Sequence, residues 1–191
     1  AEKRWGLGQN IFANSYTAGI DVNKIDFPAE VEPTVYVYHT GSFNDWLGNA
    51  SNEGAQNAQV GAGGYLAVPK DAAATMGYKS IPSTQGFLLK FTADETKLGA
   101  AASVTIPYAS VIRNDAPARA KGMNATASEP GGVQLLLEGD KGSDVLWLIE
   151  AAGTTPGYDR GWDGEKLLSN APVGMYVQMP NARLQVSAPP D

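Results

Sequence analysis

The hydrophobic positions of this chain fall in short runs that are rich in β-branched and aromatic residues. Each run has the length of a β-strand, and clusters of Gly, Pro, Asn and Asp separate the runs. No run keeps a 3.6-residue period for three turns, and the candidate helices, at residues 71–76 and 93–98, are one or two turns long. The strongest candidate strands cover residues 34–38, 87–91, 103–107, 133–138, 145–150 and 175–179, and weaker ones cover residues 20–25, 65–69 and 184–187.

Strands that follow one another without helices between them predict antiparallel sheets, because a parallel crossover needs a dozen or more residues that usually form a helix. We therefore expect an all-β protein, an antiparallel two-sheet β-sandwich with jelly-roll-like topology, long loops and only short helices. Residues 133–138 (VQLLLE) and 145–150 (VLWLIE) are apolar at nearly every position, which predicts central strands that are covered on both faces or lie at a sandwich core. The Gly- and Asp-rich residues 138–144 between them predict a hairpin.

The length of the chain, 191 residues, predicts either one domain with a sizeable core or two small domains. Residues 113–132 are polar and rich in Ala, Gly and Pro, so they are the predicted long excursion from that core. The part that follows holds too few candidate strands for an independent sandwich. We therefore predict a single β-sandwich domain over residues 1–191.

Composition then excludes several classes of function. The chain has no Cys and one His, which excludes disulfides, thiolate metal sites, a cysteine nucleophile and His-rich zinc sites. A net charge of −6 disfavours contact with the phosphates of nucleic acid. No apolar stretch approaches the roughly 20 residues that span a bilayer. We predict no nucleic-acid partner, no transmembrane segment, no cofactor and no resident metal.

Catalytic chemistry finds no support in the spacing of reactive residues. The single imidazole, His39, follows a candidate strand and enters a turn. A serine nucleophile would need this imidazole together with a strained elbow such as GxSxG, which the sequence lacks. The carboxylates are numerous, but no spacing fixes two of them at the separation that glycoside hydrolysis requires. The sequence therefore predicts a protein that is not an enzyme.

One polar spacing occurs twice: Asp140 precedes Asp144, and Asp159 precedes Asp163, with a Gly between the two carboxylates each time. Carboxylates in this arrangement can converge on a hard cation, as calcium loops do. The second copy has Gly161 where a calcium loop carries Asp or Asn. The alternative is that these Asp residues hydrogen-bond to backbone amides in tight turns, which Asp does commonly. The sequence favours the turn and leaves calcium binding by the Asp159/Asp163 loop open.

Two of the Trp residues lie among turn residues, and they are the candidates for a ligand-binding surface. An exposed indole at Trp46 or Trp162 could stack on a sugar ring or pack against another protein. The alternative is that each ring folds back beneath its own loop. Trp147 lies inside the most apolar run and is predicted to belong to the core.

Several segments, taken in order, resemble a pattern found in large exported proteins of the Bacteroidetes. In those proteins the region precedes a C-terminal sorting segment for type IX secretion. Gly19 stands where a Pro is frequent in the pattern. The matching segments are residues 5–21 (WGLGQNIFANSYTAGID), 35–38 (VYVY), 81–90 (IPSTQGFLLK), 145–148 (VLWL), 157–166 (GYDRGWDGEK), 175–177 (MYV) and 184–187 (LQVS).

The resemblance implies an extracellular or cell-surface β-sandwich with an adhesin-like role, and it implies that this chain is a piece of a longer precursor. It defines no catalytic residues. We therefore expect a non-catalytic surface module with an adhesive or structural role, whose partner is an unknown protein or glycan. A carbohydrate-binding module is the alternative, and a fragment of a secreted hydrolase is a third hypothesis. Within the module, we expect residues 157–166 to hold neighbouring strands together, with Asp159 and Asp163 capping backbone amides.

Overall fold

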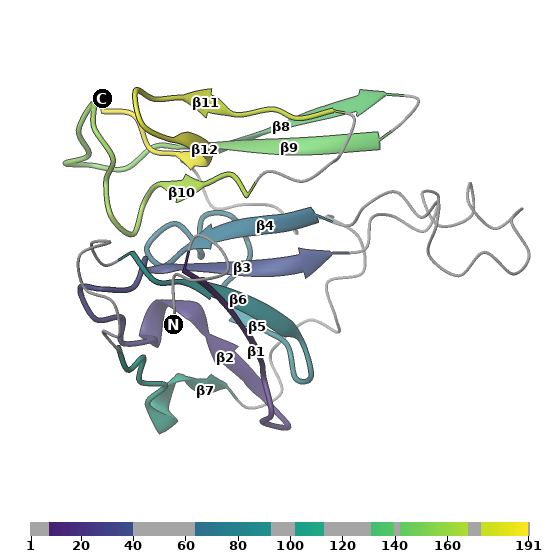
Figure 1. Cartoon of the computed structure of the whole chain (residues 1–191), viewed down its shortest axis with the longest axis vertical. Coiled ribbons are helices and arrows are strands. Elements are labelled where there is room, and N and C mark those ends of the chain that lie inside the picture. Colours follow the sequence, from purple (N-terminus) through teal and green to yellow (C-terminus); the bar gives the residue numbers. More distant parts are fainter. Residues whose placement is uncertain are drawn as a thin grey trace, which may run out of the picture.

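The computed structural model describes residues 8–39, 64–92, 102–112, 131–139, 142–167 and 173–190. These residues form twelve β-strands in three sheets, with two short 3-10 helices, so the prediction of an all-β sandwich is confirmed (Figure 1). A five-stranded sheet lies at the top of Figure 1, a four-stranded sheet lies in the middle, and a three-stranded sheet includes the strands at the bottom. The described part of the chain contains no helix that is long and apolar enough to cross a membrane.

The middle sheet has the strand order β1-β6-β3-β4, and all its neighbours are antiparallel. Its central strand β3 is buried on both faces, because Val35 and Tyr36 are each inaccessible to solvent. This explains why residues 34–38 carry an unbroken apolar and aromatic run. The four strands are β1 (Gln9–Ala13), β3 (Thr34–His39), β4 (Gly64–Pro69) and β6 (Gly86–Lys90).

The upper sheet has the order β10-β12-β9-β8, and β11 pairs with β12. Strands β8 and β9 form the predicted hairpin. Strand β12 runs parallel to β9, so this sheet is mixed instead of purely antiparallel. The connection between these two strands contains β10 and β11, which supplies the length that a parallel crossover requires. The five strands are β8 (Gly132–Gly139), β9 (Gly142–Ile149), β10 (Gly164–Glu165), β11 (Val177–Gln178) and β12 (Arg183–Ser187).

The lower sheet has the order β5-β2-β7. The strand predicted at residues 20–25 ends early, because the Asp21 carboxylate accepts a hydrogen bond from the backbone N–H of Asn23 at 3.1 Å and starts a 3-10 helix. The elements of this region are β2 (Gly19–Asp21), η2 (Val22–Lys24), β5 (Ser80–Ile81), η3 (Tyr108–Ser110) and β7 (Val111–Ile112).

Two predicted elements are wrong. Residues 103–107 pair only through one isolated bridge, between Thr105 and Asp26, and the proline at position 107 lacks the N–H that a longer ladder needs. Residues 71–76 form successive turns in place of a helix: the N–H of Met76 donates to the carbonyl of Ala72 at 3.0 Å, and Gly77 then adopts a φ of 75°. The helix predicted at residues 93–98, and most of the predicted excursion at 113–132, lie outside the described residues.

The two strands of the β8–β9 hairpin have opposite environments. Val145, Trp147 and Ile149 of β9 are each 1% exposed, as the apolar run predicts. The same prediction is wrong for β8, which lies at the edge of the sheet. Its residues Val133 and Leu136 are 55% and 57% exposed. An apolar run therefore does not distinguish a covered strand from an edge strand whose side chains meet solvent.

A single core cluster contains buried residues from all three sheets. Gln185 of β12 adds a directional contact to this packing, since its Oε1 accepts a buried hydrogen bond from the backbone N–H of Ala67 in β4 at 2.9 Å. Strand β4 is the edge of the middle sheet, so a side chain of the upper sheet satisfies a backbone donor of that edge. Representative core residues are Ile20, Val35, Val68, Ile81, Phe87, Trp147 and Val186.

Replacement of Gln185 by Leu should destabilise the protein by about 1–3 kcal/mol. The side chain keeps a similar volume, but the buried N–H of Ala67 loses its hydrogen-bond acceptor. The free energy of unfolding is measured by urea titration, with tryptophan fluorescence as the readout. Gln178→Leu is the control, because Gln178 is an exposed residue of β11 and bonds only to nearby backbone carbonyls. Equal effects of the two substitutions would show that the hydrogen bond to β4 contributes nothing.

Candidate functional site

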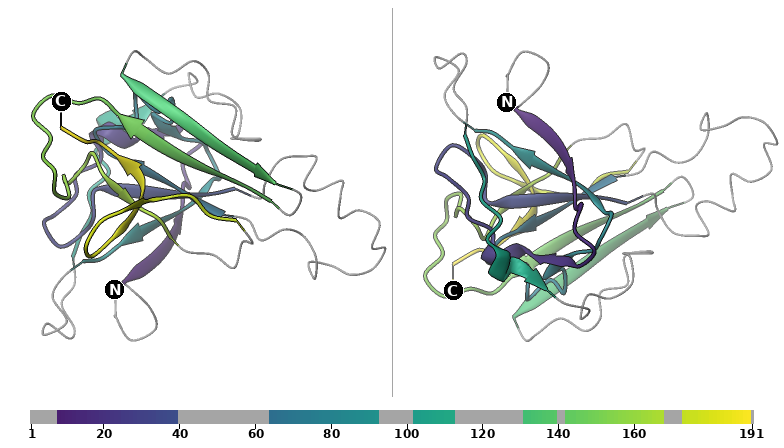
Figure 2. Two further views of the ribbon diagram at one scale, coloured as in Figure 1. Left: turned by 90° about the horizontal axis from the view of Figure 1, so that it is seen from above. Right: turned by 90° about the horizontal axis from the view of Figure 1, so that it is seen from below.

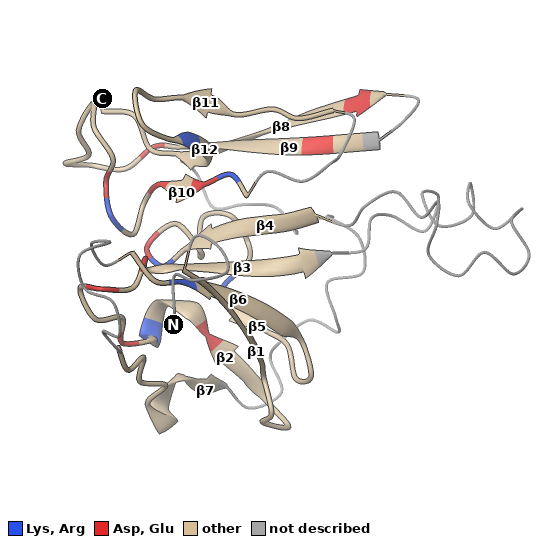
Figure 3. Ribbon diagram, viewed as in Figure 1, with Lys and Arg blue, Asp and Glu red and all other residues tan. Residues whose placement is uncertain are grey.

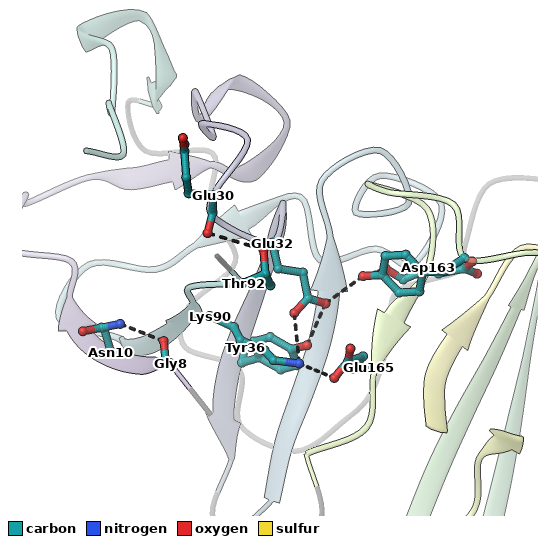
Figure 4. A network of polar contacts seen from close by, with 10 residues as sticks. Gly8, Asn10, Glu30, Glu32, Tyr36, Lys90, Thr92, Asp163 and Glu165 are labelled. Carbon is teal, nitrogen blue, oxygen red and sulfur yellow. Dashed lines mark hydrogen bonds and ion pairs between the residues drawn. The ribbon is translucent and has the colours of Figure 1, made fainter. Parts of the chain in front are cut away.

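Charged and hydroxyl-bearing side chains from the middle and upper sheets meet between the two sheets. Figure 3 shows acidic and basic residues gathered around β10, on the side of the upper sheet that faces β4. Figure 4 shows how these side chains point toward one another. We call this group the polar cluster, and it consists of the side chains of Glu32, Tyr36, Lys90, Tyr158 and Glu165 together with the backbone carbonyl of Asp163, which accepts from the hydroxyl of Tyr158 at 3.3 Å.

Glu32 is the centre of the polar cluster. It lies just before β3 and is only 3% exposed. Its Oε1 accepts hydrogen bonds from the hydroxyls of Tyr36 and Tyr158, both at 2.9 Å. Its Oε2 lies 3.9 Å from Nζ of Lys90, and that ammonium also donates to the carboxylate of Glu165 in β10. The carboxylate of Glu32 thus connects two strands of the middle sheet with the segment that enters the upper sheet.

Burial sets the protonation behaviour of this cluster. Desolvation raises the pKa of Glu32 above its ordinary value, while the charge of Lys90 and the hydroxyls of Tyr36 and Tyr158 act in the opposite direction. Burial, followed by the negative charge of Glu32, raises the pKa of both tyrosines. Both phenols therefore keep their protons at neutral pH and act as hydrogen-bond donors.

The two Asp residues of the loop at residues 157–166 bind backbone amides, as predicted. Asp163 accepts from the N–H of Asp159 at 2.7 Å and from the N–H of Ala188 at 2.8 Å. Asp159 accepts from the N–H of Thr155 at 2.6 Å and from the hydroxyl of the same residue. The two carboxylates thus stabilise the turn, and the amide of Ala188 connects the loop to the end of β12.

The basic residues of the same loop attach it to both sheets. The guanidinium of Arg160 donates to the carbonyls of Pro28 and Val31, at 2.7 and 2.5 Å, just before β3. Lys166 forms an ion pair with Asp144 of β9, and both side chains are largely buried. The expectation that this loop holds neighbouring strands is therefore confirmed, and the strands belong to two different sheets.

Two glycines permit the path of the backbone through the loop at residues 157–166. Gly161 adopts a φ of 95°, a left-handed conformation in which a side chain is strained. Gly164 begins β10, and an added Cβ there would lie 2.9 Å from Cβ of Ala67 and 3.0 Å from Cγ of Pro69 in β4. The absence of a side chain at Gly164 therefore lets the backbones of the two sheets approach closely.

A second buried anchor lies outside the polar cluster and joins two of the segments that carry the sequence resemblance. Asn14 is 1% exposed, and its Nδ2 donates to the carbonyls of Ala18, Ile81 and Pro82. The backbone of Asn14 also accepts from the N–H of Thr84 at 2.9 Å. Residues 5–21 and 81–90 are two of the segments that resemble the Bacteroidetes pattern. In the folded protein Asn14 binds one of these segments to the other.

The structure places only some of the residues that the sequence offered as candidates for a site. Trp162 is partly buried and packs against the core cluster, and Trp46 lies outside the described residues. His39 ends β3, but its imidazole lies outside the described atoms. Asp140 also lies outside the described residues, and the described part of the chain holds no group of three His, Asp or Glu side chains that could bind a metal ion. Ligand binding at either Trp stays a prediction.

The sequence pattern did not indicate Glu32, Tyr36 and Lys90 as members of a site. Glu32 and Lys90 lie at the ends of apolar strands, where charged residues ordinarily meet solvent. A possible signal was their position beside unbroken apolar runs, since a charge next to a strand that is buried on both faces needs a partner. The sequence alone could not identify that partner.

The chain is similar to a stretch of the minor fimbrium subunit Mfa5 of Porphyromonas gingivalis, a bacterium of the Bacteroidetes. The two sequences are 33% identical over 196 residues, which cover 96% of this chain. The chain spans 15% of the length of that relative. No protein-family model matches the chain, and no solved structure matches it. The predicted relation to a surface protein of the Bacteroidetes thus has support, while the sorting segment stays a prediction.

Replacement of Gly164 by Ala should destabilise the protein by about 1–3 kcal/mol, because the new methyl group would push β10 away from β4 in a packed interior. Gly86→Ala is the matched control. Gly86 also lies in a strand, and an added Cβ there would meet its nearest neighbour, the carbonyl oxygen of Phe12, at 3.9 Å. Chemical unfolding of both variants checks the prediction, which fails if G164A is as stable as G86A.

Glu32→Gln should change how stability depends on pH. The pKa of Glu32 is higher in the folded protein than in the unfolded chain. Protonated Glu32 therefore contributes its full stabilisation at pH values below its ordinary pKa of 4.5. This contribution is lost as the pH rises through the pKa that Glu32 has in the folded protein. The amide of Gln does not titrate. The free energy of unfolding of the variant, relative to the wild type, should therefore increase as the pH rises.

Urea unfolding at a series of pH values between about 4 and 8 measures this difference. Glu30→Gln removes an exposed carboxylate two residues away and controls for the general effect of losing one negative charge. A constant difference between the Glu32→Gln variant and the wild type across the series would contradict the assigned shift of the Glu32 pKa.

Proposed function

We propose that this chain is a non-catalytic module of a cell-surface protein, with a structural or adhesive role in a fimbrium-like assembly. The observation that carries the proposal is the 33% identity to a minor fimbrium subunit over 96% of the chain. That relative is named as part of a fimbrium, which is a surface assembly of protein subunits. The partner in this proposal is therefore another protein of the assembly.

The internal chemistry supports a structural role over a catalytic one. Glu32 and Asp163 are 3% and 1% exposed, and both bind donors of the protein itself. Lys90 is 9% exposed and lies between two carboxylates. Glu32 and Lys90 hold two sheets together, Asp163 holds its loop to the end of β12, and all three are too deeply buried to meet a substrate. The absence of enzymatic activity is thus part of the proposal.

A single-domain organisation is also part of the proposal. Its support is the core cluster, which contains buried residues of all three sheets, together with hydrogen bonds that join residues far apart in the sequence. The relative is much longer than this chain, so in this proposal the module is one of several parts of its parent protein.

The test is the location of the parent protein on its source bacterium. Antibodies raised against the purified chain should label the surface of intact cells in immunogold electron microscopy, and brief treatment of intact cells with a protease should remove the label. The controls are a cytoplasmic protein, which should need permeabilised cells, and a strain with an in-frame deletion of these residues, which should lose the label. Labelling that needs permeabilisation would overturn the proposal.

A further inference from the structure

Strand β8 presents an unusual surface for the edge of a sheet. It pairs with β9 on one side and ends the strand order of the upper sheet on the other, and Figure 2 shows it at the margin of that sheet. Edge strands commonly carry charges that prevent further pairing. Strand β8 has one charged residue, Glu138, close to the tip of the hairpin. Its exposed apolar residues are Val133, Leu135, Leu136 and Leu137.

We propose that β8 is a self-association site, at which the strand pairs antiparallel with β8 of a second copy of this chain. A two-fold axis perpendicular to the sheet relates the two strands and would join the two upper sheets into one. Such an axis keeps each residue on its own face of the sheet. Residues therefore lie opposite partners of the same face, and Val133, Leu135 and Leu137 share one face because side chains alternate along a strand.

The sequence of β8 is complementary to itself in one such register. When Leu135 of one copy lies opposite Leu135 of the other, Val133 of each copy lies opposite Leu137 of the other, so six apolar side chains form one continuous row. The single charge, Glu138, then lies opposite Gly132, and no like charges oppose each other. A shift by one residue would centre the contact on Gln134 or Leu136 and break this row.

The expected contact is weak. Two eight-residue strands bury well under the roughly 800 Å² per partner of a stable interface. The exposed leucines supply the apolar contact, and the edge of β8 that pairs with no other described strand supplies backbone donors and acceptors. Pairing of this strength gains from any arrangement that holds several copies close together. The inference goes beyond the surface location proposed above and does not rest on it, because pairing is a property of the isolated chain.

The absence of Cys makes the register measurable, since a single introduced Cys is the only thiol. Residues directly opposite each other in an antiparallel pair have Cα atoms about 4.5–5.5 Å apart, which is within the range of a disulfide. The two copies of Leu136 would be offset by two residues along the strands. Their Cα atoms would then lie about 8 Å apart, which is beyond the range of a disulfide. We therefore compare the variants L135C and L136C under mild oxidation at a series of protein concentrations, with non-reducing electrophoresis as the readout.

The L135C variant should form disulfide-linked dimers at least about ten times faster than L136C. Exposure alone predicts the opposite order, because Leu136 is 57% exposed and Leu135 is 40% exposed. The variant I11C is a second control, because Ile11 lies on another edge strand, β1, and is 72% exposed. Cross-linking of L136C or I11C as fast as L135C would overturn the proposal, and so would no cross-linking of L135C.

Two further variants keep the test valid if L135C folds poorly. Purified V133C and L137C should each form no disulfide-linked dimer alone, and their mixture should form a disulfide-linked heterodimer, because residue 133 of one copy lies opposite residue 137 of the other and neither lies opposite itself. Failure of the mixture to cross-link would overturn the register. Ile11→Lys added to L135C should leave its cross-linking rate unchanged, whereas Leu137→Lys should abolish the cross-link while thermal unfolding stays similar.

Discussion

A buried carboxylate fixes how two sheets of this protein lie against each other. Glu32 is almost completely removed from water, so its oxygens must find partners inside the fold. Those partners come from both sides: Tyr36 and Lys90 belong to the middle sheet, and Tyr158 lies between β9 and β10 of the upper sheet. A displacement of one sheet against the other would remove the hydrogen bond from Tyr158 to Glu32 and separate Lys90 from Glu165, and the loss of one hydrogen bond to a charged group commonly costs about 1.5–3 kcal/mol. Apolar packing joins the sheets, and this charge selects one arrangement of them.

Close backbone contact completes that arrangement. Gly164 lets β10 approach β4, and Gln185 binds the free backbone edge of β4 from the neighbouring strand β12. These contacts lie on one side of β4, and the polar cluster lies beside them. The upper sheet is thus attached by directional contacts where it meets β4, while its other end, β8, stays exposed. The same sheet therefore has one end adapted to the interior and one end open to solvent.

The strand pattern and the turn chemistry were readable from the sequence because both are local. Short apolar runs located β3, β4, β6 and β9, and the spacing of Asp159 and Asp163 indicated backbone capping. Strands of two or three residues, such as β5 and β10, are too short to leave a pattern. The polar cluster was not predictable, because it joins residues from three distant segments. The exposure of β8 was missed because composition does not reveal which strand ends a sheet.

The hydrogen bond from Tyr158 to Glu32 joins residues 126 positions apart. Chain closure over such a distance has to precede any gain from the contact, so proteins with many distant contacts fold slowly. During synthesis, the first residues of the chain must wait until the loop at residues 157–166 has emerged before Glu32 finds its second phenol. Until then Glu32 has only Tyr36 and Lys90 as partners and the edge of β4 lacks its acceptor Gln185, and we expect the nascent chain to depend on rapid completion, or on a chaperone, to avoid aggregation.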